Sequence, residues 1–481
     1  MTIDLKPYLD DPQSGWPQGG TSPSTQPKYL AIARAMSRAI HAGELIPGTR
    51  LPTHRQLADQ LGVSVQTVSR AYAQAEKMGL IQARIGSGTW VNALDDNRES
   101  AYLRAREPHP ETAIIDLSIA HPVCPPSHHL RFRQALSQLS ENLHPEVVTA
   151  NRPIAGLSHQ REQASLWLTE RLGMPGEADD RVLCNGGAHA LMLAVSTVVQ
   201  HSDLVLTEAL TDHGLIALSR TLGFQLRGVP IDERGVMPDA LDTACTRYKP
   251  RAVCLTPTQL NPTGATMDEQ RRNEVASVLE RHGVWLIEDD VHALLEPTRL
   301  TPLSARIPMQ SFHITSLTKS TVPGLRAGYL TVPRSQLHHT LPRLRATSWM
   351  ATPLMFEVAS LWIEDGTVED MASAQRELLA ERQILAAQIL HPLPRMARPS
   401  SLHLWLPLPG GWRADELQQV AEQEGLAITT STPFMVEQTV APSCIRISLG
   451  AEPELARLEE GLERLAKLLN DAPPPMMQMV Y

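Results

Sequence analysis

Short apolar segments alternate with helix-like segments from residue 114 onward, and this alternation limits the fold more than any other feature of the 481-residue sequence. The segments that read as strands are Arg181–Cys184, Leu204–Leu206, Ala252–Leu255, Val284–Ile287 and Phe312–Thr315. Helical patterns such as Asp268–Arg281 lie between them. Strands separated by helices predict a largely parallel α/β sheet, which binds its ligands at the carboxyl ends of the strands.

Polar motifs follow four of these predicted strands at the edge where such ligands bind. The motifs are Asn185-Gly186-Gly187-Ala188-His189, Asn261-Pro262-Thr263-Gly264, Glu288-Asp289-Asp290 and Ser316-Leu317-Thr318-Lys319, with Arg326 further along. Each motif alone has an ordinary explanation as a turn or a solvated charge. Their order and shared position predict one binding site.

Together these motifs resemble the fold-type I enzymes that use pyridoxal 5'-phosphate (PLP), the aminotransferase class I/II family, over residues 114–481. The resemblance implies that Lys319 forms a Schiff base with the cofactor aldehyde. It implies that Asp289 pairs with the pyridine nitrogen and that Asn261 donates to the phenolic oxygen.

The resemblance also implies a phosphate site and a carboxylate site. Backbone N–H groups of Gly187 and Ala188 at a helix N-terminus, the Ser316 hydroxyl and the Arg326 guanidinium would bind the phosphate. Arg446, in Ile445-Arg446-Ile447-Ser448, matches the arginine that binds a substrate carboxylate. The ordinary alternative for this residue is an exposed strand arginine.

Three positions depart from the family pattern. His292 stands where the family commonly has a tyrosine, although histidine can still hydrogen-bond to the phenolic oxygen. Asp212 stands where an aromatic ring usually stacks on PLP, and Asn151 replaces a tyrosine that often reaches the neighbouring subunit's phosphate. We therefore expect PLP binding with little or no physiological transaminase turnover.

The segment 27–92 is a basic module on an acidic chain. It carries eight Lys or Arg against three acidic residues, whereas the whole chain has a net charge of −9. Such asymmetry favours a nucleic-acid partner for one end of the chain. The alternative is a small helical domain with ordinary solvated charges.

Within this segment the pattern predicts a winged helix-turn-helix. Ile32, Met36 and Ile40 form one apolar stripe, and Thr53-His54-Arg55-Gln56 is a capping box that begins a second helix. Ser64 caps a third helix, whose exposed side carries Gln66, Thr67 and Arg70. Strands Leu80–Gln82 and Thr89–Val91 would flank a glycine-rich turn that forms the wing.

The same segment resembles the GntR family of bacterial regulators. The matching segments are Gly48–Ala58, Leu61–Ser64, Thr67–Tyr72, Gly79–Ile81 and Gly86–Thr89. The resemblance implies DNA contacts by Arg50, Arg55, Arg70 and the wing, which carries Arg84, while Gln66 and Thr67 can meet base edges. Val65 is a departure, because the family often has a basic or polar residue there.

A GntR-like head on an aminotransferase-like body resembles the MocR subfamily of regulators. We expect a flexible tail (1–26), the winged helix (27–92), a linker (93–113) and the PLP-binding domain (114–481). The resemblance implies a homodimer that binds a double-stranded DNA operator and senses PLP, and in addition an amino acid or other amine. Two alternatives are a working aminotransferase with a DNA-binding head, and a dimerisation scaffold that has lost PLP.

Composition excludes several other classes of protein. The five cysteines form no CxxC pair, which fits a reducing cytoplasm and argues against a structural metal site. The N-terminus has no apolar stretch typical of a secretory signal. No apolar run of about 18 residues occurs, so we expect a cytoplasmic protein without a membrane span.

Overall fold

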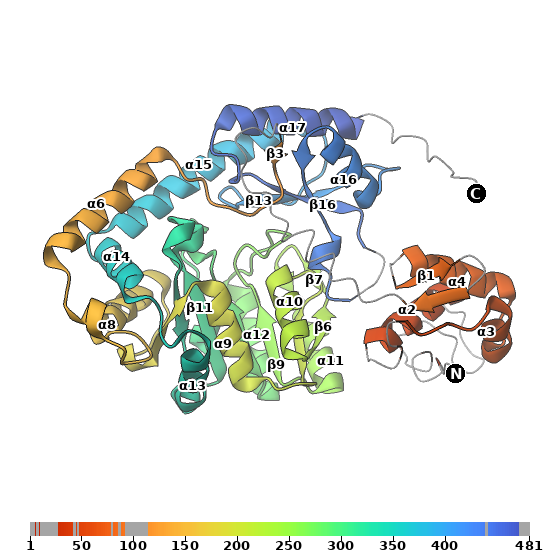
Figure 1. Cartoon of the computed structure of the whole chain (residues 1–481), viewed down its shortest axis with the longest axis horizontal. Coiled ribbons are helices and arrows are strands. Elements are labelled where there is room, and N and C mark those ends of the chain that lie inside the picture. Colours follow the sequence, from red (N-terminus) through yellow and green to blue (C-terminus); the bar gives the residue numbers. More distant parts are fainter. Residues whose placement is uncertain are drawn as a thin grey trace. The chain divides into compact units, whose positions relative to one another are not determined.

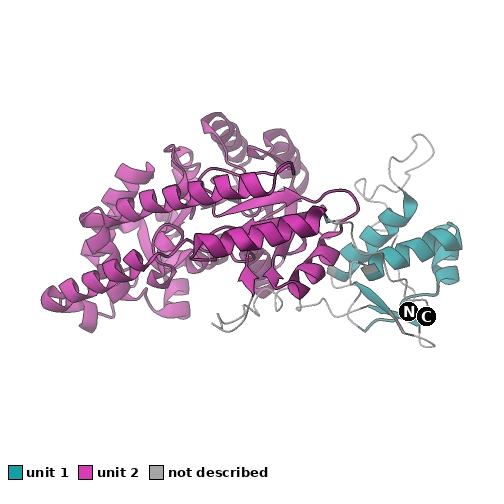
Figure 2. Cartoon of the chain, turned by 90° about the horizontal axis from the view of Figure 1, so that it is seen from above, with its two compact units in different colours: residues 1–109, 438–441 teal, residues 110–437, 442–481 magenta. Residues whose placement is uncertain are grey.

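The computed structural model describes residues 5, 9, 27–41, 45, 48–77, 80–84, 88–91, 114–437 and 441–470. The chain forms two compact units, residues 1–109 with 438–441 and residues 110–437 with 442–481 (Figure 2). Each unit has its own buried core, and each is described here by itself.

In the described part of the first unit after residue 26, three helices are followed by a two-stranded antiparallel hairpin, as predicted (Figure 1). Its elements are α2 (Lys28–His41), α3 (His54–Leu61), α4 (Val65–Lys77), β1 (Ile81–Arg84) and β2 (Gly88–Val91). The segment before α3 lines up with the hairpin, because Leu51 N donates to Thr89 O at 2.8 Å and Val91 N donates to Thr49 O at 2.8 Å.

Side-chain caps fix the ends of the helices in this unit. Thr53 and Gln56 form the predicted capping box at the start of α3, with Gln56 N donating to Thr53 Oγ1 at 3.3 Å. Gly62 ends α3 in the left-handed conformation. Thr67 N donates to Ser64 Oγ at 3.1 Å, so Ser64 caps α4 as predicted.

The apolar stripe of α2 packs against α4, in a core that α3 and the hairpin also line. Tyr72 of α4 also ties the loop before α3 to this core, because its hydroxyl donates to Pro52 O at 2.6 Å. Leu5 and Leu9, which fall in the predicted flexible tail, are buried in the same core.

The second unit is built on a seven-stranded sheet with the order β4-β12-β11-β10-β9-β5-β6. All strands run parallel except β12, which is antiparallel to both of its neighbours. The strands are β4 (Arg181–Asn185), β5 (Leu204–Glu208), β6 (Gln225–Val229), β9 (Ala252–Leu255), β10 (Trp285–Asp289), β11 (Ser311–Ser316) and β12 (Ala327–Thr331). The predicted parallel α/β sheet is confirmed.

Helices cover both faces of this sheet. Helix α9 (Gly187–Val198) packs on one face, against Cys254, Ile287 and Ile314. Helices α11 (Pro238–Tyr248) and α12 (Glu269–His282) contribute Leu241 and Leu279 to a core on the other face. The helices of this unit are α6 (Pro126–Asn142), α7 (Glu146–Thr149), α8 (Ser158–Trp167), α9 (Gly187–Val198), α10 (His213–Leu222), α11 (Pro238–Tyr248), α12 (Glu269–His282), α13 (Leu337–Ser348), α14 (Pro353–Glu364), α15 (Thr367–Ile389), α16 (Ala414–Gln423) and α17 (Leu455–Asn470).

A smaller antiparallel sheet with the order β13-β16-β15 forms a second layer of structure beneath α16 and α17 (Figure 1). The remaining strands pair in twos, β14 with β3 and β7 with β8. The bounds of these strands are β3 (Ile115–Asp116), β7 (Ile231–Asp232), β8 (Gly235–Val236), β13 (His403–Pro407), β14 (Leu426–Ala427), β15 (Thr429–Thr430) and β16 (Cys444–Ser448). Among the described helices, none is both long and apolar enough to cross a bilayer.

Candidate functional site

The predicted site residues of the second unit come from the carboxyl ends of neighbouring strands. Asp289 is the last residue of β10, and Ser316 is the last residue of β11. Both strands extend one or two residues beyond the predicted ends. Lys319 ends the short 3-10 helix η7 (Leu317–Lys319), and Gly187 begins α9 directly after β4. Because β4, β10 and β11 run parallel, these residues share one edge of the sheet.

Glycines at the start of α9 leave a cradle lined by the predicted phosphate donors. A Cβ added to Gly186, whose φ is +87°, would lie 2.7 Å from Nη2 of Arg326. A Cβ added to Gly187 would lie 2.8 Å from Val291 Cγ1 and 3.7 Å from Ser316 Cβ. The first N–H groups of a helix lack acceptors within the helix, so those of Gly187 and Ala188 can bind an anion here.

Lys319 lies beside this cradle, with its amine directed at the backbone. Its Nζ donates to the carbonyl oxygen of Ala120 at 2.7 Å. Burial lowers the pKa of Lys319, the charge of Asp212 opposes this effect, and the charge of Arg446 adds to it. A lowered pKa increases the fraction of neutral amine, which is the form that attacks a carbonyl.

Two buried groups next to Lys319 have strongly shifted pKa values. Burial, reinforced by the charge of Asp212, raises the pKa of Asp289 to about 7. Burial and the charge of Lys319 lower the pKa of His292 to about 4, so its ring is neutral at pH 7. Neither ring nitrogen of His292 has a hydrogen-bond partner of good geometry in the described part of the chain. Asp289 is therefore suited to a ligand that has a cationic nitrogen, and His292 is suited to a ligand that offers it a hydrogen bond.

Arg446 lies on β16 of the small sheet and is fully buried, so the alternative of an exposed strand arginine is wrong. Its Nη1 donates to Asn261 Oδ1 at 2.9 Å, and its Nη2 donates to the carbonyl of Ser118. The guanidinium lies 4.9 Å from the ring centroid of Phe434. Asn261, itself buried, thus joins the small sheet to the edge of the large one.

Sequence reasoning missed four residues that shape this site. Ser118 and Ala120 contribute backbone carbonyls, Phe434 contributes a ring, and His403 lies on β13 with only 1% of its surface exposed. Burial, followed by the charge of Arg446, holds the pKa of His403 well below its usual value. Contacts made by backbone atoms cannot be recognised in a sequence. His403 could have been recognised, because it is a polar residue inside the apolar run Leu402–Leu406.

The departures from the family pattern fall at different places. Asp212 accepts a hydrogen bond from Asn261 Nδ2 at 2.6 Å and therefore belongs to the site. Asn151 is exposed, and its carbonyl accepts from Trp349 Nε1 at 2.8 Å. In the ranges that the structure describes, no group of His, Cys, Asp and Glu side chains is arranged to hold a metal ion.

The first unit presents the predicted DNA-contacting residues on α3, on α4 and beside the hairpin. Arg55, Gln66 and Arg70 are exposed, whereas Thr67 is half-buried with its hydroxyl 2.8 Å from that of Ser64. Arg50 is exposed, and its guanidinium lies 5.9 Å from the Trp90 ring centroid. The side chain of Arg84 lies outside the described residues, although its backbone ends β1.

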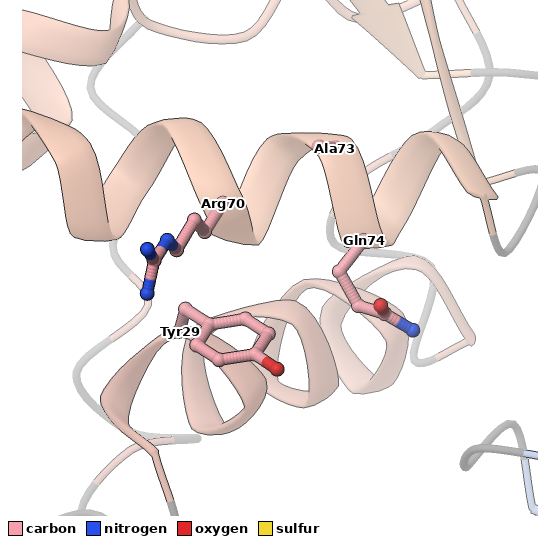
Figure 3. Close-up of a pocket in the computed structure, with 4 residues that line it drawn as sticks. All are labelled: Tyr29, Arg70, Ala73 and Gln74. Carbon is pink, nitrogen blue, oxygen red and sulfur yellow. The ribbon is translucent and has the colours of Figure 1, made fainter.

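Arg70 also lines a shallow hollow of about 270 Å³ between α4 and α2. Figure 3 shows Arg70 and Gln74 extending from α4 toward Tyr29 of α2. The guanidinium is thus accessible at the surface. Val65, the departure noted in the sequence, is also exposed at the first position of α4.

Comparison with known proteins finds a matching family for each of the two units. Residues 115–465 match the family described as aminotransferase class I and II, and residues 28–91 match the bacterial regulatory proteins of the gntR family. The HTH-type transcriptional regulator YdeF of Bacillus subtilis is 29% identical over 93% of this chain and 95% of its own length. The probable rhizopine catabolism regulatory protein MocR of Rhizobium meliloti is 26% identical over 74% of this chain and 76% of its own length.

A solved structure supports the fold of the body. The kynurenine aminotransferase of Pyrococcus horikoshii superposes with a TM-score of 0.70 and 20% identity, covering 78% of this chain and 94% of that enzyme. At this level of identity the likeness concerns the fold alone.

Proposed function

Because the chain belongs to the aminotransferase class I and II family and carries a GntR-type head, it is a MocR-like transcription regulator, and we propose that its body binds PLP as the sensing ligand. The observation that carries this proposal is the cradle at the start of α9. It brings Gly186, Arg326 and Ser316 together within reach of Lys319.

The residues present fit PLP. Arg326 and Val291 approach the backbone of Gly186 and Gly187 so closely that side chains there would collide with them, which keeps the Arg326 guanidinium next to the first N–H groups of α9. Asp289 would pair with the ring nitrogen, and Asn261 and His292 would face the phenolic oxygen. PLP supplies an aldehyde that condenses reversibly with primary amines. Lys319 is the amine we assign to that bond.

Arg446 gives the proposed effector its second contact. A buried guanidinium next to Asn261 can bind a carboxylate through paired hydrogen bonds. The effector class that this geometry suits is an amino acid or another amine with an acidic group. Asp212, in place of a stacking ring, favours sensing over rapid turnover, because it removes the aromatic face that positions PLP in the enzymes.

The head would bind an operator as part of a symmetric dimer. We assign phosphate and base contacts to Arg50, Arg55, Gln66, Thr67 and Arg70, with Arg84 on the wing.

Helix α14 packs against α6, α7 and α8, which expose Leu130, Val148 and Leu166. Exposed apolar side chains on these neighbouring helices suit an interface between two copies.

A single set of measurements on the full-length protein tests this proposal. The protein would select duplexes from a random library with and without PLP, and its mass in solution would be measured by light scattering. We expect a selected duplex with two half-sites, a dimer, and DNA affinity that changes with PLP. An absorbance titration in which added PLP keeps the spectrum of free PLP would contradict the sensing proposal. Turnover of amino acid with keto acid at enzyme-like rates would favour the aminotransferase alternative instead.

A further inference from the structure

Asp212 makes two hydrogen bonds of different kinds. It is the N-cap of α10, and its Oδ1 accepts from Gly214 N at 2.7 Å. Its Oδ2 accepts from Asn261 Nδ2 at 2.6 Å. A helix cap needs only the first of these bonds. The second bond reaches a residue 49 positions away in the chain, at the proposed cofactor site.

The Asn261 amide is held at both of its ends. Its oxygen accepts from Arg446 Nη1 at 2.9 Å, while its nitrogen donates to Asp212. If the amide turned over, its NH₂ group would face the guanidinium and its oxygen would face the carboxylate. Both arrangements are repulsive, so the amide has one orientation. One amide hydrogen remains, and no acceptor among the described residues takes it.

Charge keeps this arrangement in place at neutral pH. Burial alone would raise the pKa of Asp212, but His213, the Gly214 N–H, Asn261 and Lys319 together lower it. The carboxyl is therefore ionised. An ionised acceptor makes a stronger hydrogen bond than a neutral one, so the bond to Asn261 is worth more than a bond between neutral groups.

We propose, resting on the PLP site proposed above, that Asp212 is a positioning residue that fixes the Asn261 amide for PLP. With Arg446 on one side and Asp212 on the other, the remaining N–H of Asn261 has a fixed direction toward the phenolic oxygen. Without Asp212 the amide has only Arg446 to orient it. Asp212 thus supports the cofactor site through hydrogen bonding, in a position where the family uses a ring for stacking.

The test is a double-mutant cycle in PLP affinity, measured by absorbance titration of the full-length protein. Asp212→Ser keeps an oxygen that can cap α10, but this side chain is too short to reach Asn261. Alone, it should weaken PLP binding about three- to tenfold, the range for one hydrogen bond. In an Asn261→Ala background, the same change should no longer weaken PLP binding, because the residue that it positions is gone and only the charge of Asp212 on Asp289 and Lys319 is removed.

A matched control separates this role from capping. Asp268 is also a helix N-cap, of α12, where it accepts from Arg271 N at 2.8 Å, and Asp268→Ser should leave PLP affinity unchanged. Asp212→Asn is the second variant, since it keeps the size of the side chain but turns an amide toward Asn261. It too should weaken PLP binding only when Asn261 is present.

Equal losses in both backgrounds, or no loss at all, would overturn the assignment of Asp212 while leaving the PLP site intact. A wild-type protein that cannot be saturated with PLP would instead refute the proposed function, and this inference with it. The two failures therefore give different results in the same titration.

Discussion

Arg326 and Gly186 lie so close that a single added carbon would separate them, since a Cβ on Gly186 would stand 2.7 Å from Nη2 and 2.8 Å from Cζ of the guanidinium. The glycine has a φ of +87°, a conformation that side chains also disfavour. The position thus excludes a side chain on two independent grounds. Arg326 reaches the start of α9 only because residue 186 has none.

Gly186→Ala should therefore lower PLP affinity by about tenfold or more, because a charged hydrogen bond to the phosphate is displaced. Gly283→Ala is the matched control. Gly283 also has positive φ, +62°, but no atom lies within 4 Å of an added Cβ. It should lose some stability without changing PLP affinity. Equal affinity in Gly186→Ala and wild type, measured by titration, would place the phosphate elsewhere.

Lys319 should be the covalent anchor of PLP. Reduction with borohydride at PLP saturation, followed by peptide mass analysis, should place the pyridoxyl label on the peptide that contains Lys319. Lys319→Ala should carry no label, although it keeps the phosphate donors and Asp289. Lys467→Ala, an exposed lysine on α17, should be labelled like wild type. A label on any other lysine contradicts the assignment.

Asp289 should lower the stability of the PLP-free protein at neutral pH while it supports PLP binding. Its pKa in the folded protein, about 7, lies above the ordinary value of 3.8, so the folded state binds more protons than the unfolded chain between about pH 4 and pH 7. This carboxyl therefore makes stability fall as pH rises through that range. Asp289→Asn removes the effect and should stabilise the PLP-free protein above pH 7 by up to about 4 kcal/mol.

The measurement is urea unfolding of the PLP-free protein from pH 4 to pH 8. The difference between Asp289→Asn and wild type should be near zero at pH 4, grow up to pH 7 and stay constant above it. The same variant should bind PLP more weakly, because an amide cannot neutralise a pyridinium. A stability difference independent of pH would show that Asp289 does not titrate in this range.

Arg55 should contribute to operator binding. It is exposed on α3, and Arg55→Ala should weaken binding to the selected duplex by about 1–3 kcal/mol if it contacts a base. Arg34→Ala on α2 removes one positive charge from the same unit and serves as a control. If both variants lose affinity equally, with the same dependence on salt, Arg55 acts through general charge and reads no sequence.

The large sheet was predictable because strand and helix periods differ strongly and polar motifs follow the strand ends. All five predicted strands are present, with ends that differ by no more than two residues. Strands β6 and β12 were missed. For β12 the reason is that Ala327–Thr331 follows Arg326 without the helix that a parallel strand would need. An antiparallel strand requires no crossover helix, so no helical pattern before residue 327 indicated strand β12.

Part of the site could not be derived from sequence for a different reason. Lys319, Asp289 and the phosphate donors lie next to strand ends, where local pattern locates them. The roles of Ser118 and Ala120 depend on backbone carbonyls, and a backbone carbonyl is the same in every residue. Likewise, the bond from Asn261 to Asp212 depends on how two loops meet, which the spacing of residues along the chain does not encode.

The tripeptide from Ser118 to Ala120 accepts hydrogen bonds from both Arg446 and Lys319. A carboxylate at Arg446 and an aldehyde at Lys319 would thus each withdraw a donor from the same short stretch of backbone. Any free energy that the first ligand gains or loses through this stretch must appear, equal in size, in the binding of the second. In a regulator, such reciprocity would make the apparent affinity for the amine effector depend on the concentration of PLP.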